Sequence, residues 1–302
     1  MIQTVCGLID KKELGITLAH EHIIIDLSLI RNEQDSVLDN CKTMINEISY
    51  GKKLGLQSIV EVTNEGMGRN HLKLKYISEK AKVNIVASTG FYMEKYYDNK
   101  ARDNAEEKIA EIMIKELTFG IDDTNIKAGI IGEIGSSLNT ITELEKKVFN
   151  ACIIASEKTG AAITTHCDLG TMGLEQAMLF SRSGINLDKV IIGHSDLNRD
   201  YKVIEKILSS GVNVAFDTIS KNSYLDDDVR LYNLLKLLEM GYEDKIVLSQ
   251  DLTRKSHLKI NNGTGYTAVL GEFISKLKIN GVDSKILSKL IGGNIARVID
   301  RN

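Results

Sequence analysis

Two histidines near the N-terminus are spaced so that they could hold one metal ion. They belong to Ala19-His20-Glu21-His22, which lies near the start of an apolar run. Successive side chains of a strand point to opposite faces, so His20 and His22 share one side while Glu21 faces away. A single His-x-His pair is about as often a surface or packing feature as a metal clamp. Other residues of the sequence are needed to distinguish a metal site from a surface or packing feature.

Four more side chains with metal-ligating chemistry end short apolar runs in the same way. Two are histidines and two are carboxylates, and they are His166, His194, Glu133 and Asp251. Any one of these histidines taken alone is best interpreted as a residue that packs at a strand end. Four histidines at matched positions, joined by two carboxylates, favour a metal site.

The runs that carry these residues predict an α/β fold. Eight β-rich runs occur at 16–22, 58–63, 84–90, 128–135, 161–166, 190–194, 213–218 and 246–251. Helix-period stretches separate them, for example at 142–159. This alternation is typical of a (β/α)8 TIM barrel, whose active sites gather at the C-terminal ends of the strands. A doubly wound dinucleotide-binding sheet is the alternative, but the turn at 22–26 lacks the glycines that it needs.

Composition limits the class of partner. The 302 residues carry a formal net charge of −3, which argues against a basic nucleic-acid-binding face. No apolar run approaches the roughly 18 residues of a spanning helix, and the four cysteines show no CxxC spacing. We expect one domain over residues 1–302, a cytoplasmic location, and a small-molecule substrate with neither nucleic acid nor membrane as partner. The sequence leaves open whether the protein forms a homodimer.

Four imidazoles and two carboxylates suit two divalent first-row ions, typically zinc, with manganese, cobalt or iron as alternatives. A carboxylate with two oxygens can bridge two ions, and we assign that role to Glu133. The predicted ligands, besides the bridge, are His20, His22 and Asp251 for one ion and His166 and His194 for the other.

The segment Gly15-Ile-Thr-Leu-Ala-His-Glu-His22 resembles the first signature of the phosphotriesterase family within the amidohydrolase superfamily. The later ligand candidates follow in the family's order, and the stretches at 63–70, 171–176, 216–224 and 254–259 extend the likeness over nearly the whole chain. Most members place a carboxylated lysine on the fourth strand, where this chain has Glu133. Its bridge should therefore need no carbon dioxide.

The resemblance implies hydrolysis by a metal-bound hydroxide, a chemistry that a bound divalent ion allows near neutral pH. Asp251 is expected either to shuttle the proton to the leaving group or only to ligate metal. We favour a lactonase or carboxylesterase acting on a small, anionic (phosphorylated) sugar lactone. Phosphotriester hydrolysis is the alternative within the same chemistry, and a mononuclear deaminase or a non-catalytic metal-binding protein are alternatives of other classes.

Three residues after the strands are expected to bind substrate. Tyr92 matches a tyrosine that related lactonases carry near the metals, although a loop aromatic on the barrel rim would look the same. Lys221 and Arg254 follow the last two strands and together could receive a phosphate or carboxylate, with solvated surface charge as the alternative. His71 is expected on an exposed helix.

Overall fold

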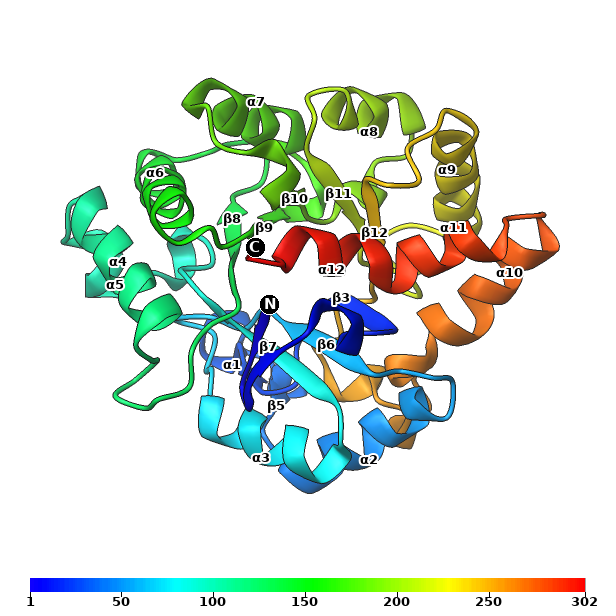
Figure 1. The fold of residues 1–302 in the computed structure, drawn as a ribbon, viewed down its shortest axis with the longest axis horizontal. Helices are drawn as coiled ribbons and strands as arrows, with labels where there is room; N and C mark the ends of the chain where they lie inside the picture. The colour runs from blue at the N-terminus through cyan, green and yellow to red at the C-terminus, as the bar shows by residue number, and fades with distance from the viewer. Residues whose placement is uncertain (302) are drawn as a thin grey trace.

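The computed structural model describes residues 1–301 and is a (β/α)8 barrel (Figure 1). Eight parallel strands lie in the order β12-β11-β10-β9-β8-β7-β6-β3. Each of the eight runs predicted from the sequence overlaps one of them, and only β8 and β9 extend beyond the predicted range, by one residue each. Their bounds are β3 Thr17–Glu21, β6 Ser58–Glu61, β7 Asn84–Thr89, β8 Ile130–Ser136, β9 Ile163–Cys167, β10 Val190–Ile192, β11 Asn213–Phe216 and β12 Ile246–Leu248.

Helices surround the strands and connect them. The bounds are α1 Ser28–Arg31, α2 Cys41–Lys52, α3 His71–Ala81, α4 Asn99–Arg102, α5 Glu106–Thr118, α6 Glu143–Thr159, α7 Gly173–Ser183, α8 Tyr201–Leu208, α9 Asp227–Glu239, α10 Ile274–Ile279, α11 Ser284–Ser288 and α12 Asn294–Ile299. The residues at the two ends of α6 explain where this helix begins and ends. Thr142 and Glu145 form a capping box, and Gly160 ends the helix at φ 68°, a conformation that glycine adopts without steric cost.

A buried carboxylate joins the first strand to the last. Glu21 of β3 accepts hydrogen bonds from the Ser249 hydroxyl at 2.5 Å and from the backbone N–H groups of Gln250 and Leu252 at 2.9 Å. The Ser249 hydroxyl in turn accepts the backbone N–H of His20 at 3.0 Å. Glu21 faces away from the histidines on either side of it, as the strand period predicts, and this orientation lets it close the barrel.

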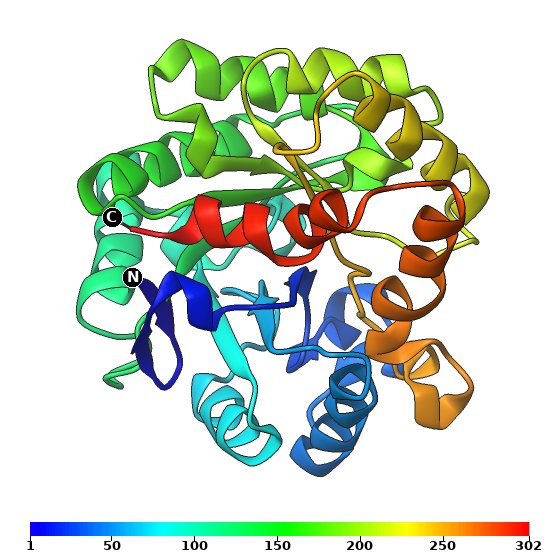
Figure 2. The same cartoon turned by 45° about the vertical axis from the view of Figure 1, so that its right-hand side comes forward.

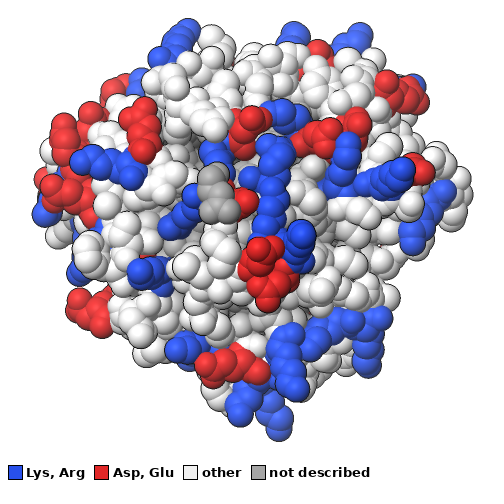
Figure 3. All heavy atoms as spheres, in the orientation of Figure 1, with Lys and Arg blue, Asp and Glu red and all other residues white. Residues whose placement is uncertain are grey.

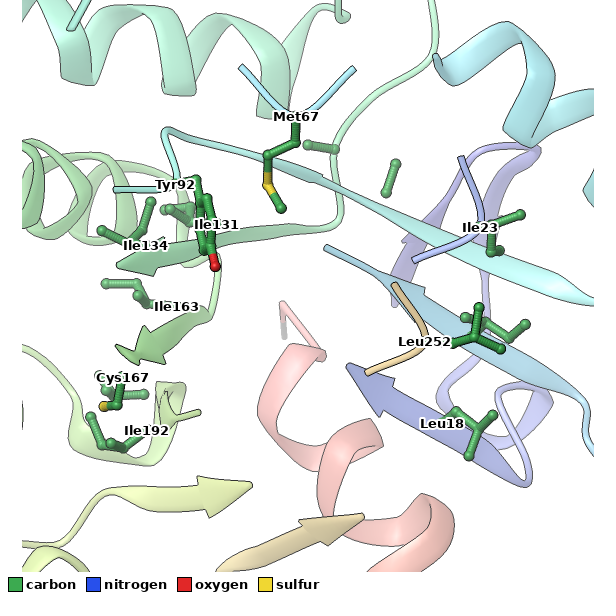
Figure 4. Close-up of a cluster of buried hydrophobic side chains, with 14 of the residues drawn as sticks. Leu18, Ile23, Met67, Tyr92, Ile131, Ile134, Ile163, Cys167, Ile192 and Leu252 are labelled. Atoms are coloured by element: carbon green, nitrogen blue, oxygen red, sulfur yellow. The ribbon is translucent and has the colours of Figure 1, made fainter. Parts of the chain in front are cut away.

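The apolar core has two parts. A small inner cluster fills the barrel and includes Ala19, Val60, Val86 and Val247, and Ile295 of α12 packs against it. Figures 1 and 2 show α12 lying across the end of the barrel that carries both chain termini. A larger cluster packs the outside of the strands against the helices, and part of it is drawn in Figure 4.

Short strands outside the barrel were not predicted from the sequence. β1 (Ile2–Thr4) and β2 (Gly7–Ile9) form an antiparallel hairpin, and β4 (Ile25–Asp26) pairs with β5 (Val37–Leu38) in the loop after β3. Within residues 1–301 no helix has the length and apolar character needed to cross a membrane. On the face drawn in Figure 3, basic and acidic side chains are intermixed.

Candidate metal centre

The barrel brings all six predicted ligands together at the C-terminal ends of its strands. Each is at most 7% exposed. Three lie within strands and three follow the end of one: His20 in β3, Glu133 in β8, His166 in β9, His22 just past β3, His194 past β10 and Asp251 past β12. His194 and Asp251 have left-handed backbones, with φ of 52° and 49°. Such strained conformations in non-glycine residues concentrate at functional sites.

One group of ligand atoms gathers around His22. Its Nε2 lies 3.1 Å from Asp251 Oδ1 and 3.3 Å from Glu133 Oε1. Nε2 of His20 lies 3.3 Å from the other Glu133 oxygen, Oε2. Two ligand atoms bound tetrahedrally to one zinc ion are about 3.3 Å apart, given metal–ligand bonds of roughly 2.0 Å. The spacing of this group therefore fits one ion.

A second group lies on the other side of Glu133. Nδ1 of His166 is 3.2 Å from Glu133 Oε2, and Nε2 of His194 is 3.9 Å from the same oxygen. The Glu133 carboxylate thus stands between two sets of histidines. Asn64 fixes its backbone, because the Asn64 side chain donates to the Glu133 carbonyl at 2.7 Å.

The donor set fits metal ions better than it fits a self-contained hydrogen-bond network. Both ring nitrogens of His20 are buried without a hydrogen-bond partner. Orphaned buried polar atoms are costly and rare unless a ligand satisfies them. Burial would raise the pKa of Glu133, but the surrounding histidines hold it well below its usual range. The carboxylate is therefore ionised and available to cations.

Residues behind the ligands set their tautomers. The Thr63 hydroxyl donates to Glu61 at 2.6 Å and so accepts from Nδ1 of His22, at 2.8 Å. Nε2 of His22 is then left with its lone pair toward the ligand group. Outer hydrogen bonds of this kind orient metal-binding histidines in many sites.

Asp217 is a functional residue that the sequence reasoning missed. It follows β11, it is fully buried, and its Oδ1 accepts from Nδ1 of His194 at 2.8 Å. Its Oδ2 lies 3.2 Å from Nδ1 of His20. One carboxylate thus supports a histidine of each group. The residue stands in the stretch 216–224 that carried the family resemblance, but its partners lie on other strands.

Of the three predicted substrate-binding residues, Tyr92 and Lys221 contact ligands of the centre, and Arg254 lines a neighbouring pocket. Tyr92 is 5% exposed, and its hydroxyl is 3.2 Å from Nδ1 of His166. Its ring belongs to the cluster of buried side chains of which Figure 4 draws a part. Lys221 is buried and forms an ion pair with Asp251. Arg254 pairs with Glu33 through two nitrogens, at 3.2 and 3.3 Å.

Two pockets adjoin the ligands. One is lined by ligands including His22, Glu133 and Asp251, and by Arg31 and Tyr92. The neighbouring pocket, of about 340 Å³, is lined by Arg254 among other residues. Lys221 and Tyr224 line both pockets, so the two spaces share a wall.

His71 is not on an exposed helix, as the sequence suggested, but is 3% exposed at the first position of α3. Burial and the adjacent Arg69 lower its pKa to about 4. An acidic cluster, Glu65, Glu116 and Asp122, lies close by. Arg69 forms ion pairs with all three of its carboxylates, so this cluster is an internal salt-bridge network.

Comparisons with known proteins agree with this site. The sequence profile described as the Phosphotriesterase family matches residues 1–299. The Phosphotriesterase homology protein of Escherichia coli is 41% identical over 267 residues, which cover 88% of this chain and 91% of the relative. An N-acetyltaurine hydrolase from Dictyostelium discoideum is 29% identical, with 99% of this chain and 97% of the relative covered.

Solved structures show the same fold. The crystal structure of the E. coli homology protein, complexed with phosphate in its active site, superposes with a TM-score of 0.93 at 38% identity, over 95% of this chain and 99% of that one. A lactonase from Listeria monocytogenes gives a TM-score of 0.94 at 29% identity, over 100% and 99% of the two chains. With a matching profile over its whole length and hydrolases among its relatives, this chain is a hydrolase that belongs to the phosphotriesterase family.

Proposed function

We propose that this hydrolase holds two divalent ions, with zinc as the preferred metal, and opens the ester bond of a small anionic lactone. The observation that carries the proposal is the position of Glu133, whose carboxylate contacts His20 and His22 of one group and His166 of the other. Cysteine takes no part in either group, whereas structural zinc sites are usually closed and often cysteine-rich. A set of this kind at a barrel mouth is suited to catalysis.

When bound, such ions supply Lewis acidity, which lowers the pKa of a water molecule and polarises a carbonyl or phosphoryl oxygen. Asp251 is the proton acceptor that we assign to the nucleophile. Burial would raise the pKa of Asp251, but Lys221 and His22 hold this pKa well below its usual range. The carboxylate is therefore ionised. Lys221 also keeps that carboxylate in place through the ion pair.

Tyr92 is placed to hydrogen-bond the carbonyl region of the substrate. Burial and the Glu133 charge hold the pKa of its phenol well above the usual value, so the hydroxyl remains protonated as a donor. The hydroxyl faces His166, whose Nδ1 belongs to the second ligand group. A carbonyl oxygen that reached this side of the centre would meet a neutral donor.

The anionic character of the proposed substrate rests on the cations at the two pockets. Lys221 lines both spaces, Arg254 lines the neighbouring pocket, and Arg31 lines the metal pocket. A phosphorylated sugar lactone could place its ring at the ligands and its phosphate toward these cations. Guanidinium groups are well suited to phosphate because two N–H donors can meet two oxygens.

An amide that bears an acidic group is the second candidate. Relatives named N-acetyltaurine hydrolase align along almost the entire chain, and the name describes an amide joined to a sulfonate. The same centre and the same cations would serve both substrates. Neutral phosphotriesters remain a third substrate class, which makes no use of the cations.

A substrate panel tests the proposal. Protein loaded with zinc or manganese should be assayed against lactones, phosphorylated lactones, N-acyl sulfonates, carboxylic esters and phosphotriesters. We expect the largest kcat/KM on a phosphorylated lactone. A higher value on the N-acyl sulfonate would select the second candidate. A preference for neutral phosphotriesters would remove the requirement for an anion, and failure to hydrolyse any of them would refute the proposal.

A further inference from the structure

Arg31 is a cationic residue of the metal pocket that neither the sequence motifs nor the ligand geometry had singled out. It is the last residue of α1, in the long loop between β3 and α2. Its half-buried side chain lines the same pocket as His22, Glu133 and Asp251. The first loop of the barrel therefore delivers a guanidinium to the space in front of the ligands.

The Arg31 guanidinium lacks a counterion. No carboxylate of residues 1–301 lies within ion-pair distance of it, and its Nη1 is buried without a hydrogen-bond partner. Two other arginines, Arg69 and Arg230, each pair with carboxylates. Arg301 also lacks a carboxylate, but it donates to the backbone carbonyls of Leu117 and Ala128. An unsatisfied donor on a buried charged group is costly, which is why such groups are normally paired.

The other cations near the two pockets already have partners. Lys221 is paired with Asp251, and Arg254 is paired with Glu33. Lys95 also lines the metal pocket, but it is exposed and its ammonium lies 5.4 Å from the centre of the Tyr96 ring. Among these four cations, Arg31 is the one with neither a carboxylate nor an aromatic face as partner, and its hydrogen-bond partner is the neutral phenol of Tyr96.

The surroundings of Arg31 keep it charged. Burial alone would lower the pKa of its guanidinium, but the adjacent Tyr92 and Tyr96 side chains, with a hydrogen bond to Tyr96, outweigh burial and the pKa is raised. Tyr92 is the residue assigned to the carbonyl region of the substrate. An anion bound at Arg31 would therefore lie near the part of the substrate that reacts.

We propose that Arg31 binds the anionic group of the substrate, a carboxylate or phosphate whose oxygens satisfy the buried Nη1 donor. The inference rests on the proposed function, because it takes the metal pocket to be the substrate site. If Arg31 binds the anion, then Arg31 rather than Arg254 determines specificity for it. Arg254 can bind an anion only when Glu33 releases its guanidinium.

Binding of inorganic phosphate to the metal-loaded protein provides the first test. Phosphate should be titrated calorimetrically into wild type, Arg31→Gln, Arg31→Lys and the control Lys95→Gln, which removes an exposed charge from the same mouth. Any interaction of phosphate with the metal ions is common to all four proteins. Because Arg31→Gln removes a charge-assisted hydrogen bond, it should weaken phosphate binding by about ten- to a hundredfold.

Arg31→Lys should fall between wild type and Arg31→Gln, because an ammonium keeps the charge but not the two-pronged donor. Lys95→Gln should stay within about twofold of wild type, since exposed charges are screened. Metal content and far-ultraviolet circular dichroism should match wild type in every variant. Equal phosphate affinity in wild type and Arg31→Gln would overturn the proposal, as would an equally weakened affinity in Lys95→Gln.

Kinetics identify the anion and separate the two proposals. KM should rise in Arg31→Gln on a phosphorylated or a carboxylated lactone but not on the uncharged parent lactone. The substrate whose KM rises shows whether Arg31 binds a phosphate or a carboxylate. If neither charged substrate responds, Arg31 is not the receptor. If wild type hydrolyses no lactone at all, the proposed function fails, while the phosphate titration still decides the role of Arg31.

Discussion

The carboxylate of Asp217 accepts a hydrogen bond from Nδ1 of His194 at 2.8 Å, on the side of the ring that faces away from Glu133. This hydrogen bond leaves Nε2 of His194 as the nitrogen that faces the ligand group. The second Asp217 oxygen approaches His20 of the other group. A single residue therefore supports both halves of the centre from behind.

We expect Asp217→Asn to weaken binding of the divalent ions by about ten- to a hundredfold, the usual effect of losing such a support. Competition with a chromogenic chelator measures this affinity. Circular dichroism should show an intact barrel. Metal affinity equal to that of wild type would show that Asp217 does not orient the histidines.

Glu133→Gln should release at least one of the two ions, because an amide is neutral and cannot bridge as a carboxylate does. Elemental analysis of protein purified without chelator should fall from about two ions per chain, as six ligands predict, to one or fewer. Added bicarbonate should leave the wild-type rate unchanged, since no lysine needs carboxylation. Full metal content and normal turnover in the variant would assign the bridge to another group.

Arg254 and Lys221 should respond differently to substitution. Arg254→Ala should reduce kcat/KM on an anionic lactone more than on its uncharged parent, whereas Lys221→Ala should slow both because Lys221 pairs with Asp251. Glu33→Gln should lower KM for the anionic substrate, since it frees the Arg254 guanidinium. Steady-state kinetics on the substrate pair checks all three. An unchanged KM in Glu33→Gln would mean that Glu33 does not compete with substrate.

Arg230 should contribute strongly to stability. Its side chain is fully buried and donates to Asp196 at 2.8 Å and to the Thr218 hydroxyl at 2.8 Å. Arg230→Leu leaves Asp196 as an unpaired buried charge, so the free energy of unfolding should fall by about 3–5 kcal/mol. Urea denaturation measures it. The double variant Arg230→Leu, Asp196→Leu should recover part of this stability. If it recovers none, the broken ion pair is not the cause of the lost stability.

His71 should make the protein less stable in acid. Burial and Arg69 lower its pKa from 6.5 to about 4, so the unfolded chain binds a proton that the folded chain refuses. The contribution is present above pH 6.5 and is lost as the pH falls toward 4, by about 3 kcal/mol in total. The unfolding free energy of His71→Gln should therefore fall less than that of wild type between pH 7 and 4.5. Parallel pH profiles would refute this assignment.

The barrel and the six ligand candidates could be predicted from the amino-acid sequence. Apolar runs of strand length with polar ends are local patterns, and a parallel barrel places every strand end at one mouth. His20 and Asp251 could therefore be assigned to one centre although they belong to the first and last strands of the barrel. Glu133 could be predicted as the bridge from its place at the end of the fourth strand, where the related family carries a carboxylated lysine, and that role stays a prediction.

The partner of each charged group, in contrast, could be seen only in the folded protein. Asp217 supports His194, Glu33 covers Arg254, and Arg31 is left without a counterion. The burial of His71 belongs to the same class, because a helix start looks alike in sequence whether or not a loop covers it. These interactions join residues far apart in the chain, and their distances depend on loop conformations and barrel closure, which no local periodicity encodes.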